Sequence, residues 1–548
     1  MKKIFRFLFA FAMILTGCQK DLDLIPKDQI ADETFWQTSA QFKLAANDFY
    51  YKLQEAPNYT DLNSDIAFGS GSNSVSNGSY LAEANSGIWD DAWEGIRGVN
   101  YLLEKSRGYT GDEDISRWVG EAWFFRAYFY WKLVKSFGGV PLITSVLTID
   151  SEDLYKPRST QREIIDFIIA NLDSAANSLP LQSELAETEL GRVTSGAALT
   201  LKARAALYQA SWVKFHENGD ASALYTEAVN AAEQVITSGE YELYTQPNNS
   251  GYKFLFILRG DDSKEVILAR RYYIDRITHN WTRELWFNYM VPTKNLADLY
   301  LAVDGLPISK SSLFGGYDEL DSEFRNRDPR MAMTFIVPGS TIYADGGIWA
   351  VTYPGFTGTN ATQTGYMLRK FLDETLEATQ FQGSYDFKEF RYAEVLLILA
   401  EALLERDGSV SDGDLDRTIN VIRTRVSMPP LTNALVTGNG LDMRAEIRRE
   451  RTVELAFEGF RRDDLRRWKT AETLMPLAIK GVKFVGTEYE QRYPDLRIGT
   501  DIQVDANGFI VTEAAAARRF LPNKHYLDPL PLQQVQLSKG SLTQNPEW

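Results

Sequence analysis

The chain has 548 residues, enough for one large domain or two to three fused ones, and its 44% apolar and 24% charged residues are typical of a globular protein. Its net charge of −16 excludes the basic surface that binds a nucleic-acid backbone. A single cysteine, Cys18, excludes an intramolecular disulfide and a metal site built from several thiolates.

The N-terminus has the pattern of a secretory signal. Residues 2–6 carry two lysines and an arginine, and the apolar run Phe7–Leu15 that follows is too short to span a bilayer. The run leads into Leu-Thr-Gly before Cys18, which resembles a bacterial lipobox and implies cleavage before Cys18 and lipidation of that residue. We therefore assign residues 1–17 to a lipoprotein signal peptide and residues 18–33 to the lipidated cysteine and a polar tether.

Helical periodicity organises the chain from residue 34 to residue 240. Gly120–Phe137 carries eight aromatic residues distributed around the helix, so we expect it to be buried on most faces. Gly138 and Pro141 then mark its end. Small residues recur on two later segments, which favours close antiparallel pairing as in tetratricopeptide repeats. The expected helices are Phe42–Leu53, Ile88–Asn100, Gly120–Phe137, Thr160–Leu179, Ala198–Trp212 and Tyr225–Ile236.

Two stretches interrupt this helical pattern. Asn58–Gly87 is rich in Gly, Ser and Asn without an apolar period, which predicts a long loop. Tyr241–Phe387 is rich in Gly, Pro, Tyr and Trp, with a short strand expected at Lys264–Arg271. Long ordered loops in compact domains are usually functional. Helices resume with the expected pair Arg391–Arg406 and Asp414–Arg425.

The segment Glu450–Trp468 combines an apolar helical stripe with dense charge. Arg451, Glu454 and Glu458 fall opposite the stripe, three and four residues apart, where opposite charges on a helix pair at about 0.2–0.5 kcal/mol each. We therefore expect a charge-laced helix docked by its apolar face, and not an active site. The stripe consists of Val453, Ala456, Phe457 and Phe460, and Gly459 weakens the helix next to it.

The same segment carries a resemblance to a known family. ERTVELAFEGFRRDDLRRW, the segment Gly120–Leu142 and the ending Leu542–Trp548 resemble the SusD/RagB family, the surface lipoproteins that capture nutrients beside a TonB-dependent transporter. The resemblance extends from Cys18 to Trp548. It implies a mostly α-helical fold in which tetratricopeptide-like antiparallel helix pairs form a curved scaffold, with short strands and a loop-rich, irregular ligand-binding region.

The resemblance also implies region boundaries, a cellular location and a partner for the protein. Residues 34–240 are expected to form an N-terminal SusD-like helical region, and residues 241–548 a C-terminal SusD/RagB region. The C-terminal region comprises a loop-rich part, a helical part and a tail, at residues 241–387, 388–480 and 481–548. By the same resemblance, the protein is lipid-anchored to the outer membrane, faces outward, and hands a glycan to a SusC-like TonB-dependent transporter.

Signatures of catalysis are not found in the sequence. It has no G-x-x-x-x-G-K-[ST] phosphate loop, no G-x-S-x-G elbow and no H-E-x-x-H pair. Two carboxylates about 5–10 Å apart suffice for a glycosidase, and spacing among 74 acidic residues does not exclude such a pair. The family is not enzymatic, and we expect no catalytic residue, metal or cofactor. The three histidines share no metal-ligand spacing: His216, His279 and His525.

Residues suited to bind a sugar lie in the two loop-rich stretches. Sugars present apolar CH faces and hydroxyl edges, so their sites combine aromatic rings with amide and hydroxyl groups. In the related proteins such loops build the ligand surface, although none of these positions belongs to a shared motif. The predicted ligand-binding residues are Asn73, Asn77, Tyr80, Trp281, Trp286, Tyr289, Trp349 and Tyr353.

Three alternatives remain open beside glycan capture. The same architecture serves some relatives for oligopeptides, which glycan and peptide arrays would distinguish. A lipid-anchored glycoside hydrolase would reveal itself by turnover of a bound ligand. A helical-repeat adaptor without small-molecule cargo would bind neither.

Overall fold

The computed structural model describes residues 32, 34–344, 347–351, 355–357, 361–374 and 382–548. Cys18 and Tyr353 therefore lie outside the described residues. The prediction of a mostly α-helical chain with short strands is confirmed. The α-helices before residue 240 are α2 (Ser39–Asn47), α3 (Ser74–Asn77), α4 (Gly87–Arg107), α5 (Ser116–Phe137), α6 (Gln161–Ser178), α7 (Ser195–Trp212) and α8 (Ser222–Thr237).

The remaining elements are shorter and more scattered. The later α-helices are α9 (Gly251–Leu255), α10 (Trp281–Trp286), α11 (Lys294–Ala297), α12 (Pro329–Thr334), α13 (Tyr392–Asp407), α14 (Asp412–Asp416), α15 (Ile419–Arg425), α16 (Asn433–Gly438), α17 (Met443–Glu454), α18 (Arg461–Arg467), α19 (Ala471–Leu474), α20 (Glu488–Arg492) and α21 (Leu532–Leu537). Single 3₁₀ turns lie at η1 (Asp48–Lys52), η2 (Thr60–Asn63), η3 (Glu152–Tyr155), η4 (Gln182–Glu184), η5 (Glu187–Glu189), η7 (Pro247–Asn249), η8 (Leu258–Gly260), η9 (Ser322–Phe324) and η10 (Ala515–Ala517), and a π-helical turn at η6 (Val213–Glu217).

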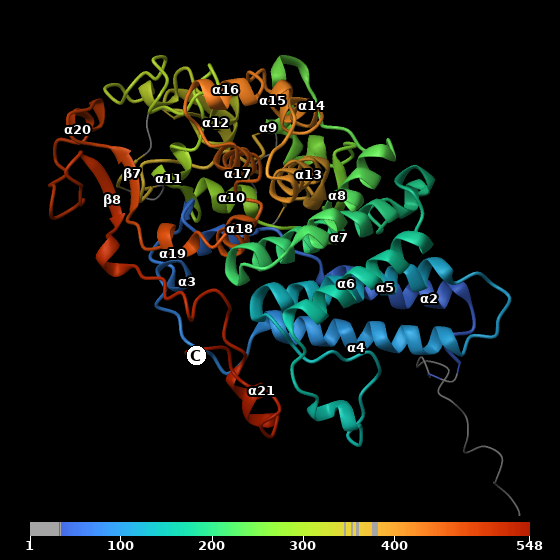
Figure 1. The fold of residues 1–548 in the computed structure, drawn as a ribbon. Coiled ribbons are helices and arrows are strands. Elements are labelled where there is room, and N and C mark those ends of the chain that lie inside the picture. The colour runs from blue at the N-terminus through green and yellow to red at the C-terminus, as the bar shows by residue number, and fades with distance from the viewer. Residues whose placement is uncertain (1–31, 33, 345–346, 352–354, 358–360, 375–381) are drawn as a thin grey trace, which may run out of the picture.

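The helices α4 to α8 form a layer in which each helix packs against the next along the chain (Figure 1). Local sequence sets their starts: Thr160 and Glu163 form a reciprocal capping box at α6, and the Thr194 hydroxyl caps α7. Helix α7 is buried on nearly all sides because small residues such as Ala198 and Ala205 let its neighbours approach closely. The expected burial of the aromatic helix α5 is also confirmed.

Beyond residue 240 the pairing differs from the sequence-based expectation. The predicted helix Asp414–Arg425 is two short helices, α14 and α15, separated at Thr418, where φ is −125° and ψ is −89°. Helix α13 packs mainly against α8 and α17 rather than against α15, so it extends the helical layer. A second apolar core, which includes Trp281, Phe371 and Phe457, fills the loop-rich region.

The described strands pair as antiparallel two-stranded ladders. The predicted strand at Lys264–Arg271 is confirmed as β2, and it pairs with β6 in the register Val266↔Arg391. The ladders are β1 (Ala67–Phe68) with β3 (Val291–Pro292), β2 (Val266–Arg270) with β6 (Phe387–Arg391), β4 (Ser340–Ala344) with β5 (Gly347–Val351), and β7 (Ile479–Lys483) with β8 (Phe509–Glu513). Strand β1, η2 and α3 lie within Asn58–Gly87, so that predicted loop contains short ordered elements.

The expectation of a charge-laced helix docked by its apolar face at Glu450–Trp468 is met only in part, because the segment forms two helices and its charged side chains are buried. Helix α17 ends at Glu454, the chain turns through positive φ at Phe457 (66°) and Gly459 (88°), and α18 starts at Arg461. The charged side chains face inward: Glu454 is 0% exposed and Arg451 is 3% exposed. Arg451 pairs with Asp464 of α18 at 2.9 Å, whereas Glu454 and Glu458 form ion pairs with distant segments.

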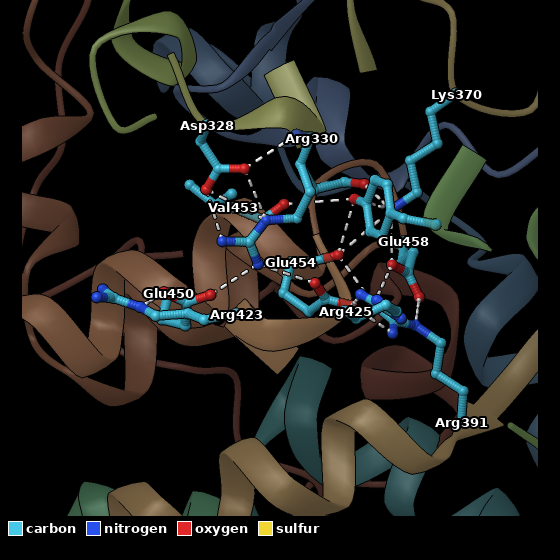
Figure 2. A network of polar contacts seen from close by, with 12 residues as sticks. Asp328, Arg330, Lys370, Arg391, Arg423, Arg425, Glu450, Val453, Glu454 and Glu458 are labelled. Carbon is cyan, nitrogen blue, oxygen red and sulfur yellow. Dashed lines mark hydrogen bonds and ion pairs between the residues drawn. The ribbon is translucent and has the colours of Figure 1, made fainter. Parts of the chain in front are cut away.

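Those ion pairs form a buried network around the C-terminal end of α17 (Figure 2). The Glu454 carboxylate contacts Arg425 at 2.6 Å and Arg391 at 2.8 Å. The linked side chains are five cations and five anions, so their formal charges cancel and each buried charge has a partner. They are Arg330, Lys370, Arg391, Arg423, Arg425, Glu265, Asp328, Glu450, Glu454 and Glu458.

The network is a structural element and not a reaction centre. Burial opposes ionisation of Glu454, but the guanidinium groups of Arg425 and Arg391 hold the pKa of Glu454 well below its usual range. A carboxylate saturated by arginines in this way has no free oxygen to act as a base. The expectation that this segment is architecture therefore agrees with the contacts, although the charges are buried and not exposed.

Candidate functional site

The short β1–β3 ladder brings two of the predicted binding segments together. Ala67 pairs with Pro292 and Phe68 pairs with Val291, so the loop that follows β1 lies beside the residues that precede β3. A Cβ built on Gly69 would lie 3.5 Å from the Tyr289 carbonyl oxygen, which shows how closely the two backbones approach. The loop-rich stretches around residues 70 and 289, far apart in sequence, thus form one surface. We call the surface of residues 69–73 and 289 the loop face.

The loop face presents an aromatic ring beside small polar groups. The Tyr289 side chain is 52% exposed, and its backbone N–H donates to the Glu284 carbonyl at 3.1 Å, which continues the turn after α10. Ser70 and Ser72 are exposed on the neighbouring loop. Asn73 is half-buried, and its Oδ1 accepts hydrogen bonds from the N–H groups of Val75 and Ser76, both at 2.9 Å, as the N-cap of α3. The Asn73 side chain thus shapes the loop, while the serines and Tyr289 are free to contact a ligand.

The predicted residues Asn77 and Tyr80 hold the C-terminal tail. Asn77 is buried, and its Nδ2 donates to Glu513 Oε1 at 3.2 Å. The Tyr80 ring lies 4.7 Å from that of Trp548 and 5.4 Å from that of His525, measured between ring centroids. Burial, together with the nearby Asp528 carboxylate, raises the pKa of the Tyr80 hydroxyl. Both side chains are therefore used within the fold.

The predicted residues Trp281 and Trp286 are core residues. Trp281 is 0% exposed and stacks on Phe371, with 4.0 Å between ring centroids and 19° between planes. Trp286 is 5% exposed and packs with Ile336 and Ile342 in a small satellite cluster. The expectation that these rings form an exposed platform is not met, because α10 turns both toward apolar neighbours. Tyr289, which comes directly after this helix, is the aromatic residue that stays at the surface.

The last two predicted residues belong to the segment after residue 340. Trp349 lies on β5 and pairs with Ile342 of β4, but its side chain is outside the described part of the structure, as is Tyr353. Ser70 and Ser72, which lie between β1 and Asn73, are not among the residues predicted from the sequence. The alternation of glycine and serine in GSGSNS is the signal that marks them as exposed hydroxyl groups.

The loop face carries the aromatic and polar groups of a binding surface. Across the described ranges, no group of three or more His, Cys, Asp or Glu side chains has the geometry to hold a metal ion. The Glu284 carboxylate, on α10 shortly before Tyr289, accepts a hydrogen bond from the Tyr59 hydroxyl. Burial and this carboxylate raise the pKa of Tyr59 above its ordinary value. A ring beside hydroxyl groups fits the apolar face and polar edge of a sugar.

Comparison with known proteins places the chain in a family. The model of the SusD family matches residues 256–548, and a model described as "Starch-binding associating with outer membrane" matches residues 24–207. The chain belongs to the SusD family. The resemblance of the segment Glu450–Trp468 to that family is thereby confirmed.

Individual relatives match this chain in sequence or in structure. SusD-like protein P2 of Formosa agariphila is 26% identical over 86% of this chain and 91% of that protein. SusD-like protein P38 of the same organism is 26% identical over 47% of this chain, which spans about half (51%) of P38. A crystal structure of a SusD-like carbohydrate binding protein from Bacteroides fragilis is 25% identical, with a TM-score of 0.75, and covers 93% of this chain and 99% of its own.

A membrane-spanning helix is not among the described elements of this SusD family member: none of them has both the length and the apolar composition to cross a bilayer.

Proposed function

We propose that the protein is a non-enzymatic, cell-surface glycan-binding lipoprotein that captures oligosaccharide and delivers it to a SusC-like TonB-dependent transporter. The observation that carries the proposal is an exposed aromatic ring, Tyr289, beside the hydroxyl groups of Ser70 and Ser72 in a SusD family chain. Support comes from the Bacteroides fragilis relative, whose structure is described as that of a carbohydrate binding protein.

Capture would depend on several weak contacts between the sugar and the exposed loop face, and the free energies of these contacts add. The Tyr289 ring would stack on the apolar CH face of a sugar, and the serine hydroxyls would both donate to and accept from its hydroxyl groups. An exposed face of this kind suits binding followed by release to a second protein, since it does not enclose the ligand.

The setting of the protein is part of the same proposal. A lipid on Cys18 would anchor the chain to the outer membrane, on its outer side, with residues 19–33 as tether. The second family description, which associates its members with the outer membrane, supports this location. The transporter partner rests on the resemblance to the family alone.

The test is calorimetry of the chain from residue 19 onward against plant, host and microbial polysaccharides and against a panel of oligopeptides. We expect one class of polysaccharide to bind, and Tyr289→Ala to weaken that binding about tenfold, the value of one lost stacking contact of about 1.4 kcal/mol. Tyr273→Ala is the matched control, because Tyr273 is also 52% exposed but lies after β2, away from the loop face. Binding of peptides and of no polysaccharide would overturn glycan capture.

A further inference from the structure

Two segments project from one edge of the molecule beside α4: the connection between α5 and α6, which contains η3, and α21 (Figure 1). They are in contact, because Lys539 Nζ, shortly after α21, lies 4.3 Å from the centroid of the Tyr155 ring of η3. The chain before α4 joins them, since the Leu532 N–H donates to the Glu83 carbonyl oxygen at 2.9 Å. We call the exposed apolar side chains of these segments the apolar projection: Leu81, Ile149, Leu154, Tyr155, Leu532 and Leu537.

The apolar projection is highly exposed to solvent. Ile149 is 89% exposed, the highest value among the large apolar side chains of the described residues, and Leu81 and Leu537 are 73% and 61% exposed. The turn at Ile149 leads directly into η3, because the Leu154 N–H donates to the Ser151 carbonyl oxygen at 3.1 Å. Single exposed apolar side chains are ordinary on a protein surface, but a group of six on connected segments marks an interaction surface.

The charges of the projecting segments nearly cancel. Residues 81–84, 149–158 and 532–539 together carry four carboxylates and three cations. Asp153 and Lys156 pair with each other at 3.4 Å. A surface that attracts anionic lipids or acidic proteins carries an excess of lysine and arginine, and these segments have no such excess. Contact with a partner therefore depends on the apolar side chains.

The tether enters the described structure beside the apolar projection. Asp32, the first described residue, accepts a hydrogen bond from the Tyr101 hydroxyl on α4. Four residues earlier on the same face of α4, Arg97 Nη1 donates to the Leu147 carbonyl oxygen of the α5–α6 connection at 2.8 Å. Four residues of an α-helix span about 6 Å. The chain that leads back to Cys18 and the α5–α6 connection therefore meet α4 at neighbouring points.

A lipid anchor makes a weak apolar contact sufficient. Cys18 and Asp32 are 14 residues apart, a stretch of chain that spans at most about 50 Å. A short tether holds the attached protein at an effective concentration on the order of millimolar. Insertion with a dissociation constant on the order of millimolar, too weak to recruit a free protein, is therefore populated in the anchored protein.

The size of the apolar projection favours a lipid surface over a protein partner. A stable protein–protein interface involves about 20–30 residues on each side, whereas the apolar projection has six. Segments that bind at a membrane interface bury apolar side chains at the boundary between headgroups and acyl chains. The composition fits this depth, because leucine and isoleucine favour the acyl region and tyrosine favours the interface.

We propose that the apolar projection inserts into the lipid surface to which the protein is anchored, with Ile149 as its leading side chain. The protein then meets the membrane at two points, the acylated Cys18 and the apolar projection, and the α4 edge of the helical layer faces the lipid. The inference rests on the lipid anchor of the proposed function, whereas glycan capture at the loop face does not depend on it. Because charge contributes little, the insertion is insensitive to salt.

The experiment places a polarity-sensitive fluorescent label on the whole lipidated protein, reconstituted alone in phosphatidylcholine vesicles. Cys18 is the single cysteine of the chain, so once it is acylated, Ile149→Cys supplies one reactive thiol. We expect the label there to emit at shorter wavelength than the same label at Val421→Cys, and to lose its emission when the lipids carry a nitroxide on the acyl chain. Val421→Cys is the matched control, because Val421 is 39% exposed on α15, at the opposite edge of the molecule (Figure 1).

A second substitution tests the neighbouring leucines. Leu537→Ser in the labelled protein is expected to lower the ratio of inserted to free label about tenfold, the value of removing one leucine from the lipid. The melting temperature is expected to stay unchanged, because Leu537 is exposed. Leu258→Ser is the matched control, because Leu258 is 47% exposed on η8, outside the apolar projection, and is expected to leave the ratio unchanged.

The outcomes separate this inference from the proposed function. Equal quenching of the Ile149 and Val421 labels, or an inserted fraction that Leu537→Ser leaves unchanged, would overturn the insertion. Insertion that rises with the density of protein in the vesicle, or that needs added transporter, would overturn the lipid contact in favour of a second copy or the transporter. Protein that does not float with the vesicles would overturn the anchor itself. Tyr289→Ala is the cross-check: it is expected to weaken polysaccharide capture and to leave the inserted fraction unchanged.

Discussion

Arg425 and Glu454 are in direct contact at 2.6 Å, with 1% and 0% of their side chains exposed. Arg425 belongs to α15 and Glu454 is the last residue of α17, so this ion pair joins two helices at the centre of the C-terminal region. Arg391 of β6 contacts the same carboxylate at 2.8 Å, which connects the pair to the end of the β2–β6 ladder. The stability of this region therefore depends on charge balance as well as on apolar packing.

Removing the charge of Glu454 is expected to destabilise the protein strongly. In Glu454→Gln, the cations of the network lose their shared anion, and breaking a buried ion pair in this way costs about 3–5 kcal/mol of unfolding free energy. Urea denaturation measures the change. Glu233→Gln is the control, because the Glu233–Arg417 pair, with side chains 30% and 41% exposed, is on the surface and contributes less than about 1 kcal/mol. If Glu454→Gln and Glu233→Gln lose equal amounts of unfolding free energy, the buried network contributes no more to stability than a surface ion pair does.

Asp61 is expected to make the protein less stable as the pH rises toward neutrality. Burial raises the pKa of Asp61 to about 7, although the N–H groups of Gly459 and Arg461 donate to its carboxylate. The unfolded chain releases this proton near pH 4, about the ordinary value for aspartate, while the folded chain keeps it to higher pH. Between these two values the folded state binds more protons, so the unfolding free energy falls as the pH increases.

The measurement for Asp61 is urea denaturation at several pH values between about 4.5 and 7.5. In this range the folded and unfolded states differ in whether Asp61 is protonated. Asp61→Asn is expected to flatten the decline with pH, whatever its effect on absolute stability. Asp90→Asn, at an exposed position on α4, is expected to keep the wild-type slope. A slope in Asp61→Asn as steep as that of the wild type would assign the pH dependence to other groups.

Trp281 is expected to matter for stability and not for ligand contact. Because its ring is fully buried against Phe371, Trp281→Ala leaves a cavity and lowers the unfolding free energy by about 3–5 kcal/mol. Tyr289→Ala, at an exposed position on the loop face, is expected to change stability by less than about 1 kcal/mol. Loss of glycan binding in Trp281→Ala at unchanged stability would show that this ring faces the ligand instead.

Gly481 is expected to tolerate no side chain. A Cβ at this position of β7 would lie 1.9 Å from the Thr364 backbone oxygen, which accepts a hydrogen bond from the Val482 N–H at 2.8 Å. Gly481→Ala therefore forces the two backbones apart and is expected to cost about 1–3 kcal/mol in urea denaturation. Gly438→Ala is the control, since a Cβ there meets nothing within 4 Å and α16 gains a better helix former. If the two variants are similarly stable, β7 can move away from the Thr364 backbone at little cost in unfolding free energy.

The sequence predicted the helical layer well because the determinants of those helices are local. The cap at Thr194 and the small residues of α7 lie within a few residues of the structure they specify, and the helix follows them closely. The interior of the loop-rich region was less predictable. At Trp281 and Tyr289, eight residues apart, the same aromatic-rich segment supplies a core residue and a surface residue, and composition alone does not distinguish them.

The sequence by itself determined the helices, the loop-rich stretches and the resemblance to the SusD family. Periodicity, helix caps and motifs depend only on residues that are close together in the chain. Only the tertiary structure decided which charges are buried and which apolar side chains stay exposed. Glu454 meets Arg391 across 63 residues, and Lys539 meets Tyr155 in the apolar projection. Whether a side chain faces water, a counter-ion or the core depends on segments that only folding brings together.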